Sequence, residues 1–219
     1  MTSDASIKSH PLGRDSRETL LGVAGEIFAE RGYEAATIKE ITERAGVNVA
    51  SVNYYFRDKL GLYTEVLRGC LHKGKLALPP ECEGLPAEER LTRYIHSFVN
   101  TLVAVGQPSW CGRLMVRELA QPTPALPHLI EEIIRPNFMV LRQLVQDVAG
   151  QRMGEETLDL LTHSVHAQCA HWKTSRVVFP YLWPELRFDE AKVRQIAGHI
   201  AVFSIAGIRA TALLEAPGS

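Results

Sequence analysis

Apolar residues recur at helical spacing along almost the whole chain, and this feature constrains the fold more than any other. Leu20, Ala24, Ile27 and Phe28 follow one another at steps of four, three and one, which places them on one face of a helix over residues 15–32. Similar patterns predict helices over residues 37–45, 49–56, 58–78, 86–106, 109–120, 125–149 (kinked at its proline, Pro136), 155–178 and 189–214. No β-pattern or internal repeat competes with them. The sequence therefore predicts an all-α fold.

The composition fits an ordered globular protein. The chain of 219 residues is long enough to bury a sizeable core, and its 46% hydrophobic and 22% charged residues are ordinary for a folded domain. The net charge is −1, and residues 1–60 carry eight Lys and Arg against nine Asp and Glu. Any binding of nucleic acid must therefore depend on where the charges lie rather than on their sum.

The cysteines and the N-terminal segment indicate a cellular compartment. Cys70, Cys82, Cys111 and Cys169 are scattered, form no C-x-x-C pair and do not resemble a disulfide framework, which favours a reducing interior. The N-terminal segment lacks an apolar signal core, and the apolar runs look shorter than the roughly 20 residues that span a bilayer. We expect a cytoplasmic protein with no membrane partner.

Capping residues and a glycine divide the N-terminal region into short helices. The sequence "TIKE" at residues 37–40 has the form of a capping box, in which Thr37 and Glu40 satisfy each other's backbone NH groups. Gly46 ends this helix, and Asn48 can cap the next one. Asp58 can cap a fourth helix. Two helices joined by a short turn describe a helix-turn-helix, whose second helix enters the major groove of DNA.

The second helix of this pair offers a face for DNA. On a 100° wheel, Val52 and Phe56 share the inward face, whereas Ala50, Ser51 and Tyr54 are predicted on the opposite side, flanked by Asn53 and Tyr55. Small side chains near the helix start would let the helix approach the bases closely. The two tyrosines would reach phosphates. For Tyr55 a second interpretation stays open, in which the ring packs half-buried on the fourth helix.

Residues 17–67 resemble the DNA-binding domain of the TetR family of bacterial transcriptional regulators. The shared positions are Phe28, Gly32, Thr37, Ile41, Ala45, Gly46, Tyr54, Phe56, Lys59 and Leu62. A narrower resemblance, to the CecR-like branch of the family, is carried by "NVASVNYYF", by "LMVRELAQPTPAL" at residues 114–126 and by "HSVHAQCAHW" at residues 163–172. Together these segments extend the resemblance over most of the chain.

The resemblance implies which residues contact DNA. Thr37 would contact phosphate while it caps its helix, and Lys59 would bind a phosphate at the start of the fourth helix, whose N-terminus also attracts anions. Val49 departs from the family pattern, because this position is often lysine or another polar residue; a valine can touch a thymine methyl but forms no charged contact. The predicted DNA-binding residues are Thr37, Lys39, Asn48, Val49, Ala50, Ser51, Asn53, Tyr54, Tyr55 and Lys59.

The resemblance also implies a domain organisation. We expect a flexible arm over residues 1–14, a three-helix DNA-binding domain over residues 15–60, and a helical bundle for ligand binding and dimerisation over residues 61–219. The last two helices would form the interface of a homodimer. Small residues at helical spacing, which let two helices approach closely, predict that this interface contains Ala197, Ala201, Ser204 and Ile208. Packing of these residues within one subunit is the alternative.

Two sets of residues in the bundle are candidates for small ligands. An effector cavity is predicted to be lined by Trp110, Arg113, Leu114, Arg117, His163 and His166, although Arg117 could instead join Glu118 in a network that ties helices together. The alternative function is a helical metal-binding protein or enzyme that uses the His163, His166 and Cys169 cluster. No carboxylate partner or catalytic set accompanies this cluster, so we expect no metal, no cofactor and no enzymatic activity.

The resulting prediction is a homodimeric, cytoplasmic transcriptional regulator, of a family whose members are usually repressors. It would bind a palindromic operator in double-stranded DNA. A small-molecule effector in the C-terminal bundle would shift the fourth helix and so change the separation of the two recognition helices.

Overall fold

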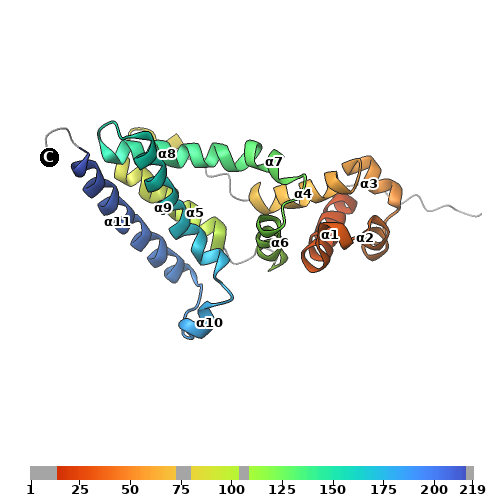
Figure 1. The fold of residues 1–219 in the computed structure, drawn as a ribbon. Helices are drawn as coiled ribbons and strands as arrows, with labels where there is room; N and C mark the ends of the chain where they lie inside the picture. Colours follow the sequence, from red (N-terminus) through yellow and green to blue (C-terminus); the bar gives the residue numbers. More distant parts are fainter. Residues whose placement is uncertain (1–13, 73–79, 104–108, 216–219) are drawn as a thin grey trace, which may run out of the picture.

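The computed structural model describes residues 14–72, 80–103 and 109–215, and every regular element within these ranges is a helix (Figure 1). The predicted all-α fold is therefore confirmed. The expected N-terminal arm lies outside the described residues except for Arg14, and so do the predicted ends of the helices at residues 78 and 106.

The elements follow one another along the chain with short connections. The N-terminal part contains α1 (Arg14–Ala35), α2 (Ile38–Ala45), α3 (Val49–Phe56) and α4 (Lys59–His72). The middle contains a short 3-10 helix, η1 (Pro80–Cys82), then α5 (Ala87–Val103), α6 (Ser109–Ala120), α7 (Leu126–Leu129) and the π-helical turn η2 (Ile130–Ile134). The C-terminal part contains α8 (Arg135–Ala149), α9 (Glu155–Thr174), α10 (Phe179–Leu182) and α11 (Glu190–Leu214).

The helix predicted over residues 125–149 is present as α7, η2 and α8 in direct succession. Pro136 has no NH to donate to the carbonyl of Glu132, so it interrupts the regular pattern of helical hydrogen bonds. The π-helical turn lies immediately before it, and the NH of Arg135 donates to the carbonyl of Ile130. The irregularity expected at the proline is thus taken up in the preceding turn.

Buried apolar side chains form two clusters at opposite ends of the molecule. The N-terminal core includes Leu20, Phe28 and Val52 of α1 and α3, together with Leu114 of α6 and Leu129 of α7. The C-terminal core is built by α5, α8, α9 and α11. Figure 1 shows α1 to α3 at one end and α11 at the other, with α4 and α6 between them. Two middle helices, α6 and α7, therefore share their core with the N-terminal helices.

Helix α11 differs from the expectation that every apolar run is short. Among the described helices it is the one that is long and apolar enough, by length and composition, to cross a membrane. In the fold, however, its residues Val193, Ile200 and Ile208 are buried in the C-terminal core, where α11 packs on α5. Core helices of folded domains meet the same length and composition criteria, and this burial accounts for the apolar character of one face of α11.

Candidate DNA-binding surface and ligand cavity

The helix-turn-helix is built from local capping contacts. The Thr37 hydroxyl accepts from the NH of Glu40 at 3.2 Å, and the Asn48 side chain accepts from the NH of Ala50 at 2.8 Å. Gly46 ends α2 in the left-handed region with φ 66°. Both predicted N-caps and the glycine stop are confirmed. The Glu40 carboxylate forms an ion pair with Arg31 at 3.0 Å, so only one half of the expected capping box is observed.

Helix α3 presents a mixed face to solvent. Val52 and Phe56 are buried, as predicted, while Ala50, Asn53 and Tyr54 are exposed, and Tyr54 retains 75% of its accessible surface. The prediction that Ser51 faces outward is wrong, because only 4% of this residue is exposed. Neighbouring helices cover a wider part of the α3 surface than the face formed by Val52 and Phe56. They therefore also bury Ser51, which lies 100° from Val52 around the helix axis.

The two tyrosines of α3 have different surroundings. Their rings meet edge to face, with centroids 4.9 Å apart. Tyr55 packs against the N-terminal core, and its buried hydroxyl has no hydrogen-bond partner among the described residues. Tyr54 extends into solvent. The packing interpretation therefore describes Tyr55, and Tyr54 is the tyrosine whose hydroxyl is available to a phosphate.

Several cations lie near α3, although the net charge of the whole chain is close to zero. Lys39 is exposed and lies 3.9 Å from Glu43, whereas the Lys59 ammonium donates to the carbonyl of Glu34 at 3.1 Å. Arg57, which the sequence analysis did not select, is exposed directly after α3 with φ 73° and forms no ion pair within the described residues. The sequence could have indicated Arg57 as a DNA contact, because this residue directly follows the helix that exposes Tyr54. Lys39 and Arg57 are thus the more accessible cations on this surface.

A cavity of about 270 Å³ lies among α4, α5, α6, η2, α8 and α9. Its walls are mainly apolar and include Leu102, Met115, Ile133 and Phe138. Its volume is close to the lower end of typical ligand pockets. The cavity adjoins both α4, which follows the helix-turn-helix, and α6, which packs on α1.

Three of the residues predicted to bind the effector lie instead between α6 and α1. A Cβ placed on Gly25 would lie 2.3 Å from the indole of Trp110, so only glycine permits this approach of α1 to α6. Leu114 is fully buried in the N-terminal core. Arg117 reaches carbonyls near the end of α1 and lies beside Gly32, whose φ of 82° favours glycine. These side chains connect helices and do not line the cavity.

The other three predicted residues are divided between solvent and the cavity. Arg113 is exposed, and so is His163, whose ring lies on Phe138 with centroids 4.8 Å apart. His166 lines the cavity and lies 5.3 Å from the ring of Phe98. Burial, together with the neighbouring His163, lowers the pKa of His166, so this imidazole is neutral near pH 7. His166 is the one member of the predicted set that lines the cavity.

A buried carboxylate connects α4 to α6. Glu118 is fully buried and accepts from the hydroxyl of Tyr63 at 2.7 Å. It also accepts from the NH and the hydroxyl of Thr123, each at 2.9 Å. Burial and the contact with Glu118 both raise the pKa of Tyr63, so its proton stays in this hydrogen bond. A network through Glu118 does tie helices together, with Tyr63 rather than Arg117 as its partner.

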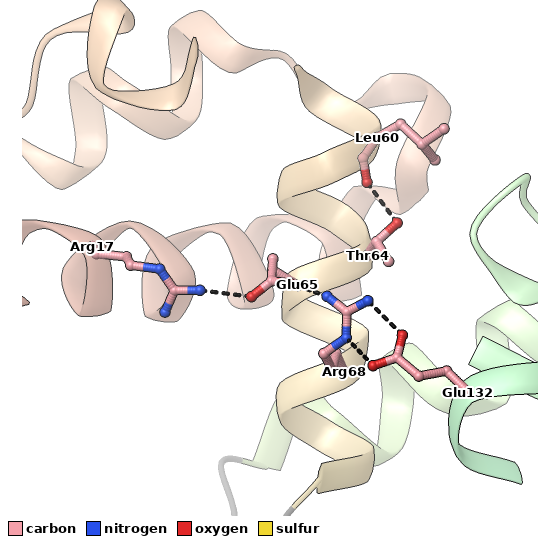
Figure 2. Close-up of polar contacts among 6 residues, drawn as sticks. All are labelled: Arg17, Leu60, Thr64, Glu65, Arg68 and Glu132. Atoms are coloured by element: carbon pink, nitrogen blue, oxygen red, sulfur yellow. Dashed lines mark hydrogen bonds and ion pairs between the residues drawn. The ribbon is translucent and has the colours of Figure 1, made fainter. Parts of the chain in front are cut away.

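A chain of ion pairs joins α1, α4 and η2 on the other side of α4. Arg17 donates to Glu65 at 2.6 Å, and Arg68 also pairs with Glu65. Arg68 donates to both oxygens of Glu132, at 2.9 and 2.6 Å. Figure 2 shows these contacts. Bidentate geometry fixes the orientation of a guanidinium more strictly than a single contact. The network therefore restrains α4 relative to both α1 and η2.

The structure joins Cys70 of α4 to Cys111 of α6 by a disulfide with a Cα–Cα distance of 5.6 Å. This pairing corrects the expectation that the cysteines form no disulfide framework, so they no longer support a reducing interior. Residues 41 apart in sequence come together only through the contact of the two helices. Cys82 and Cys169 are free and buried. Among the described residues, no group of three or more His, Cys, Asp and Glu side chains could bind a metal ion.

The predicted dimer residues of α11 also need correction. Four residues predicted at the dimer interface are buried within the subunit, where α11 packs mainly on α5: Ala197, Ala201, Ser204 and Ile208. The alternative of packing within one subunit is therefore correct for these four residues. The exposed apolar residues of α11 lie on its opposite face, at Val202, Phe203, Leu213 and Leu214.

The chain joins a capped helix-turn-helix to a helical bundle with an apolar cavity, which is the domain organisation typical of one-component transcriptional regulators. The family model for "Bacterial regulatory proteins, tetR family" matches residues 20–66, and the model for the CecR C-terminal domain matches residues 87–208. The chain belongs to the TetR family of bacterial transcriptional regulators, in its CecR-like branch.

Individual relatives agree with this family assignment. The dual regulator CecR of Shigella flexneri is 24% identical over 84% of this chain and 87% of its own length. The repressor KstR2 of Rhodococcus jostii is 40% identical over 60 residues, which cover 27% of this chain and only 29% of KstR2. The activator FasR of Mycolicibacterium smegmatis is 44% identical over 28% of each chain. The matched segments thus cover less than a third of the length of KstR2 and of FasR.

Solved structures share the fold. FadR of Bacillus subtilis, in complex with stearoyl-CoA, has a TM-score of 0.64 at 16% identity and covers 87% of this chain and 98% of its own. A mutant of HlyIIR has a TM-score of 0.59 at 24% identity, with 84% and 95% covered. CecR, KstR2, FasR and FadR are all transcriptional regulators.

Proposed function

We propose that this protein is a homodimeric, cytoplasmic repressor that binds a palindromic operator through α3 and is switched by a small molecule in the cavity beside α6. The single observation that carries the DNA-binding role is the exposed face of α3, where Ala50, Asn53 and Tyr54 project from a helix capped by Asn48. The family match over residues 20–66 supports this role. The proposal includes no catalytic activity, because the named relatives are regulators.

The DNA contacts divide by chemistry. Ala50 and Val49 would meet base edges and thymine methyls, and Asn53 would offer an amide to a base. Tyr54 and Arg57 would contact phosphates on one side of α3, with Lys39 and Thr37 at α2 and Lys59 at α4 completing the set. Ser51 is left out of this set because it is buried.

Dimerisation would use the exposed face of α11 together with α9. Val202, Phe203 and Leu213 recur at helical spacing on α11 and are exposed, and α9, which contacts α11, exposes Leu160. Such apolar stripes on a monomer mark interaction surfaces. A two-fold pair of subunits would present two copies of α3 to the two halves of a palindrome.

The ligand switch would act on the helices next to the cavity. A ligand shifts the equilibrium only if it binds the DNA-incompetent arrangement more tightly than the competent one. Helices α4 and α6 both line the cavity and both share the N-terminal core, so their displacement would move the DNA-binding helices. The FadR relative with stearoyl-CoA supports a small-molecule effector in a protein of this fold.

The test is a comparison of Tyr54→Phe with a matched control. A duplex is first selected by the wild-type protein from a random pool, and its affinity is then measured by fluorescence anisotropy. Loss of one hydrogen bond to a charged phosphate should weaken binding about tenfold, or roughly 1.4 kcal/mol. Tyr181→Phe removes the hydroxyl of another exposed tyrosine, on α10, and should leave the affinity unchanged.

The selection and the titration each have an outcome against the proposal. If no duplex is enriched, or if the enriched sequences lack two-fold symmetry, the palindromic operator is refuted. If Tyr54→Phe binds as tightly as the wild type, Tyr54 has no phosphate contact.

A further inference from the structure

The cavity beside α6 contains one charged side chain in an apolar setting. Among the described lining residues, no Asp or Glu is present, and Lys173 of α9 is the only Lys or Arg. The Cε of Lys173 lies 4.0 Å from the point that a Cβ on Gly112 would occupy, so its stem runs along α6. A single cation among apolar walls is an arrangement that fixes the orientation of a ligand.

No counter-charge for the ammonium of Lys173 is found among the described residues. The side chain is partly buried, and this burial lowers its pKa, with no carboxylate acting in the opposite direction. No ion pair or side-chain hydrogen bond of Lys173 occurs within the described ranges. A partly desolvated cation without a partner is costly, and a ligand that supplies the partner recovers this cost.

Two neighbouring hydroxyls in the cavity wall are already engaged. The hydroxyl of Tyr94 donates to the carbonyl of Asn137 at 3.0 Å, and the hydroxyl of Thr174 donates back to carbonyls of its own helix at 3.3 and 3.4 Å. His166, held neutral by burial, is the remaining ring with a polar atom at the cavity. Lys173 is therefore the strongest donor at this site with free hydrogen-bonding capacity.

We propose that the cavity binds a small monoanion with an apolar body, and that Lys173 pairs with its carboxylate. The inference rests on the ligand-responsive function proposed above and names the chemical class of its effector. The apolar body would contact walls such as Phe98, Met115 and Ile133, and the carboxylate would lie toward the α6 side of α9. A charge-assisted hydrogen bond in a dry site is stronger than a neutral one, which favours an anion over the corresponding alcohol.

The volume limits the size of this ligand. A cavity of 150 Å³ accommodates benzene with its six carbon atoms, so the cavity of about 270 Å³ accommodates on the order of ten non-hydrogen atoms. Octanoate has about this size. Its neutral and cationic counterparts, 1-octanol and octylamine, have nearly the same apolar chain and differ at the head group, so the three compounds separate charge from apolar burial.

The experiment is isothermal titration calorimetry of the full-length protein with these three compounds. We expect the wild type to bind octanoate at least about tenfold more tightly than 1-octanol, and octylamine more weakly than both. Lys173→Met keeps the unbranched apolar stem as far as Cε but removes the ammonium, and should abolish the preference for octanoate. Lys173→Arg keeps the charge and should retain the preference. Lys192→Met removes a lysine of α11 outside the cavity and should behave as the wild type.

Either of two results overturns the inference: equal affinity of the wild type for octanoate and 1-octanol, or an unchanged octanoate preference in Lys173→Met. Operator binding, measured in parallel by anisotropy, separates this inference from the proposed function. A protein that binds DNA but does not prefer octanoate refutes the ligand class alone. A protein that prefers octanoate but binds no DNA refutes the regulator proposal and leaves the anion site standing.

Discussion

Replacement of Cys70 and Cys111 by alanine should lower the stability of the oxidised protein by an amount set by the length of the loop that the disulfide closes. The two cysteines are 41 residues apart, and the chain-entropy estimate for a loop of this length is about 4 kcal/mol at 25 °C. The side chains themselves are small and only 3% and 4% exposed, so the alanines add a modest loss of packing. The disulfide thus dominates the expected difference.

The assay is urea unfolding of three samples: the oxidised wild type, the wild type with a thiol reductant, and the Cys70→Ala/Cys111→Ala double variant. We expect the free energy of unfolding to be about 4 kcal/mol higher in the first sample than in the other two. Cys169→Ala removes a free buried cysteine and serves as the control. This variant should be less stable at baseline but should still lose the same increment when reductant is added.

Two observations would refute the reasoning. One is an oxidised wild type that unfolds at the same urea concentration as the double variant. The other is recovery, from a non-reducing digest, of the Cys70 and Cys111 peptides as separate free thiols. The result also bears on function, because an intact disulfide fixes α4 against α6 at the wall of the cavity.

Two further predictions concern buried polar groups. Glu118→Gln replaces the carboxylate that accepts three hydrogen bonds from Tyr63 and Thr123. This change should lower the free energy of unfolding by about 1.5–3 kcal/mol. The control Glu30→Gln, at an exposed position of α1, should have no measurable effect. Burial raises the pKa of Cys169 to about 12, so at pH 8 only about one thiol in 10,000 is ionised. Iodoacetamide should therefore label Cys169 in urea but not in the folded protein. Labelling of Cys169 in the native state would contradict this prediction.

The sequence predicted the parts of the DNA-binding surface that depend on local chemistry. Capping by Thr37 and Asn48 is decided within three residues of the chain, and the burial of Val52 and Phe56 follows from helical spacing. Ser51 was misplaced because the wheel gives the direction of a side chain but not the width of the surface that neighbouring helices cover. That width is a tertiary property.

The contacts of the C-terminal helices were harder to predict for the same reason. A stripe of small residues such as Ala197 and Ala201 shows that α11 is approached closely, but it does not say whether the approaching helix belongs to the same subunit. In this fold α5 occupies that face. The disulfide between Cys70 and Cys111 likewise depends on the crossing of α4 and α6, which the spacing of cysteines in sequence does not reveal.

The two faces of α6 add this helix to the route expected from sequence, in which a ligand shifts the fourth helix and so changes the separation of the recognition helices. Met115 and Val116 line the cavity, while Trp110 packs on α1 where Gly25 leaves no room for a Cβ. Because a side chain cannot compress a backbone that it already touches, a ligand that pushes α6 toward α1 would displace α1 with it. Helix α4 is bound to α6 through Glu118 and so moves with the same unit. We infer that α4 and α6 transmit the ligand signal together.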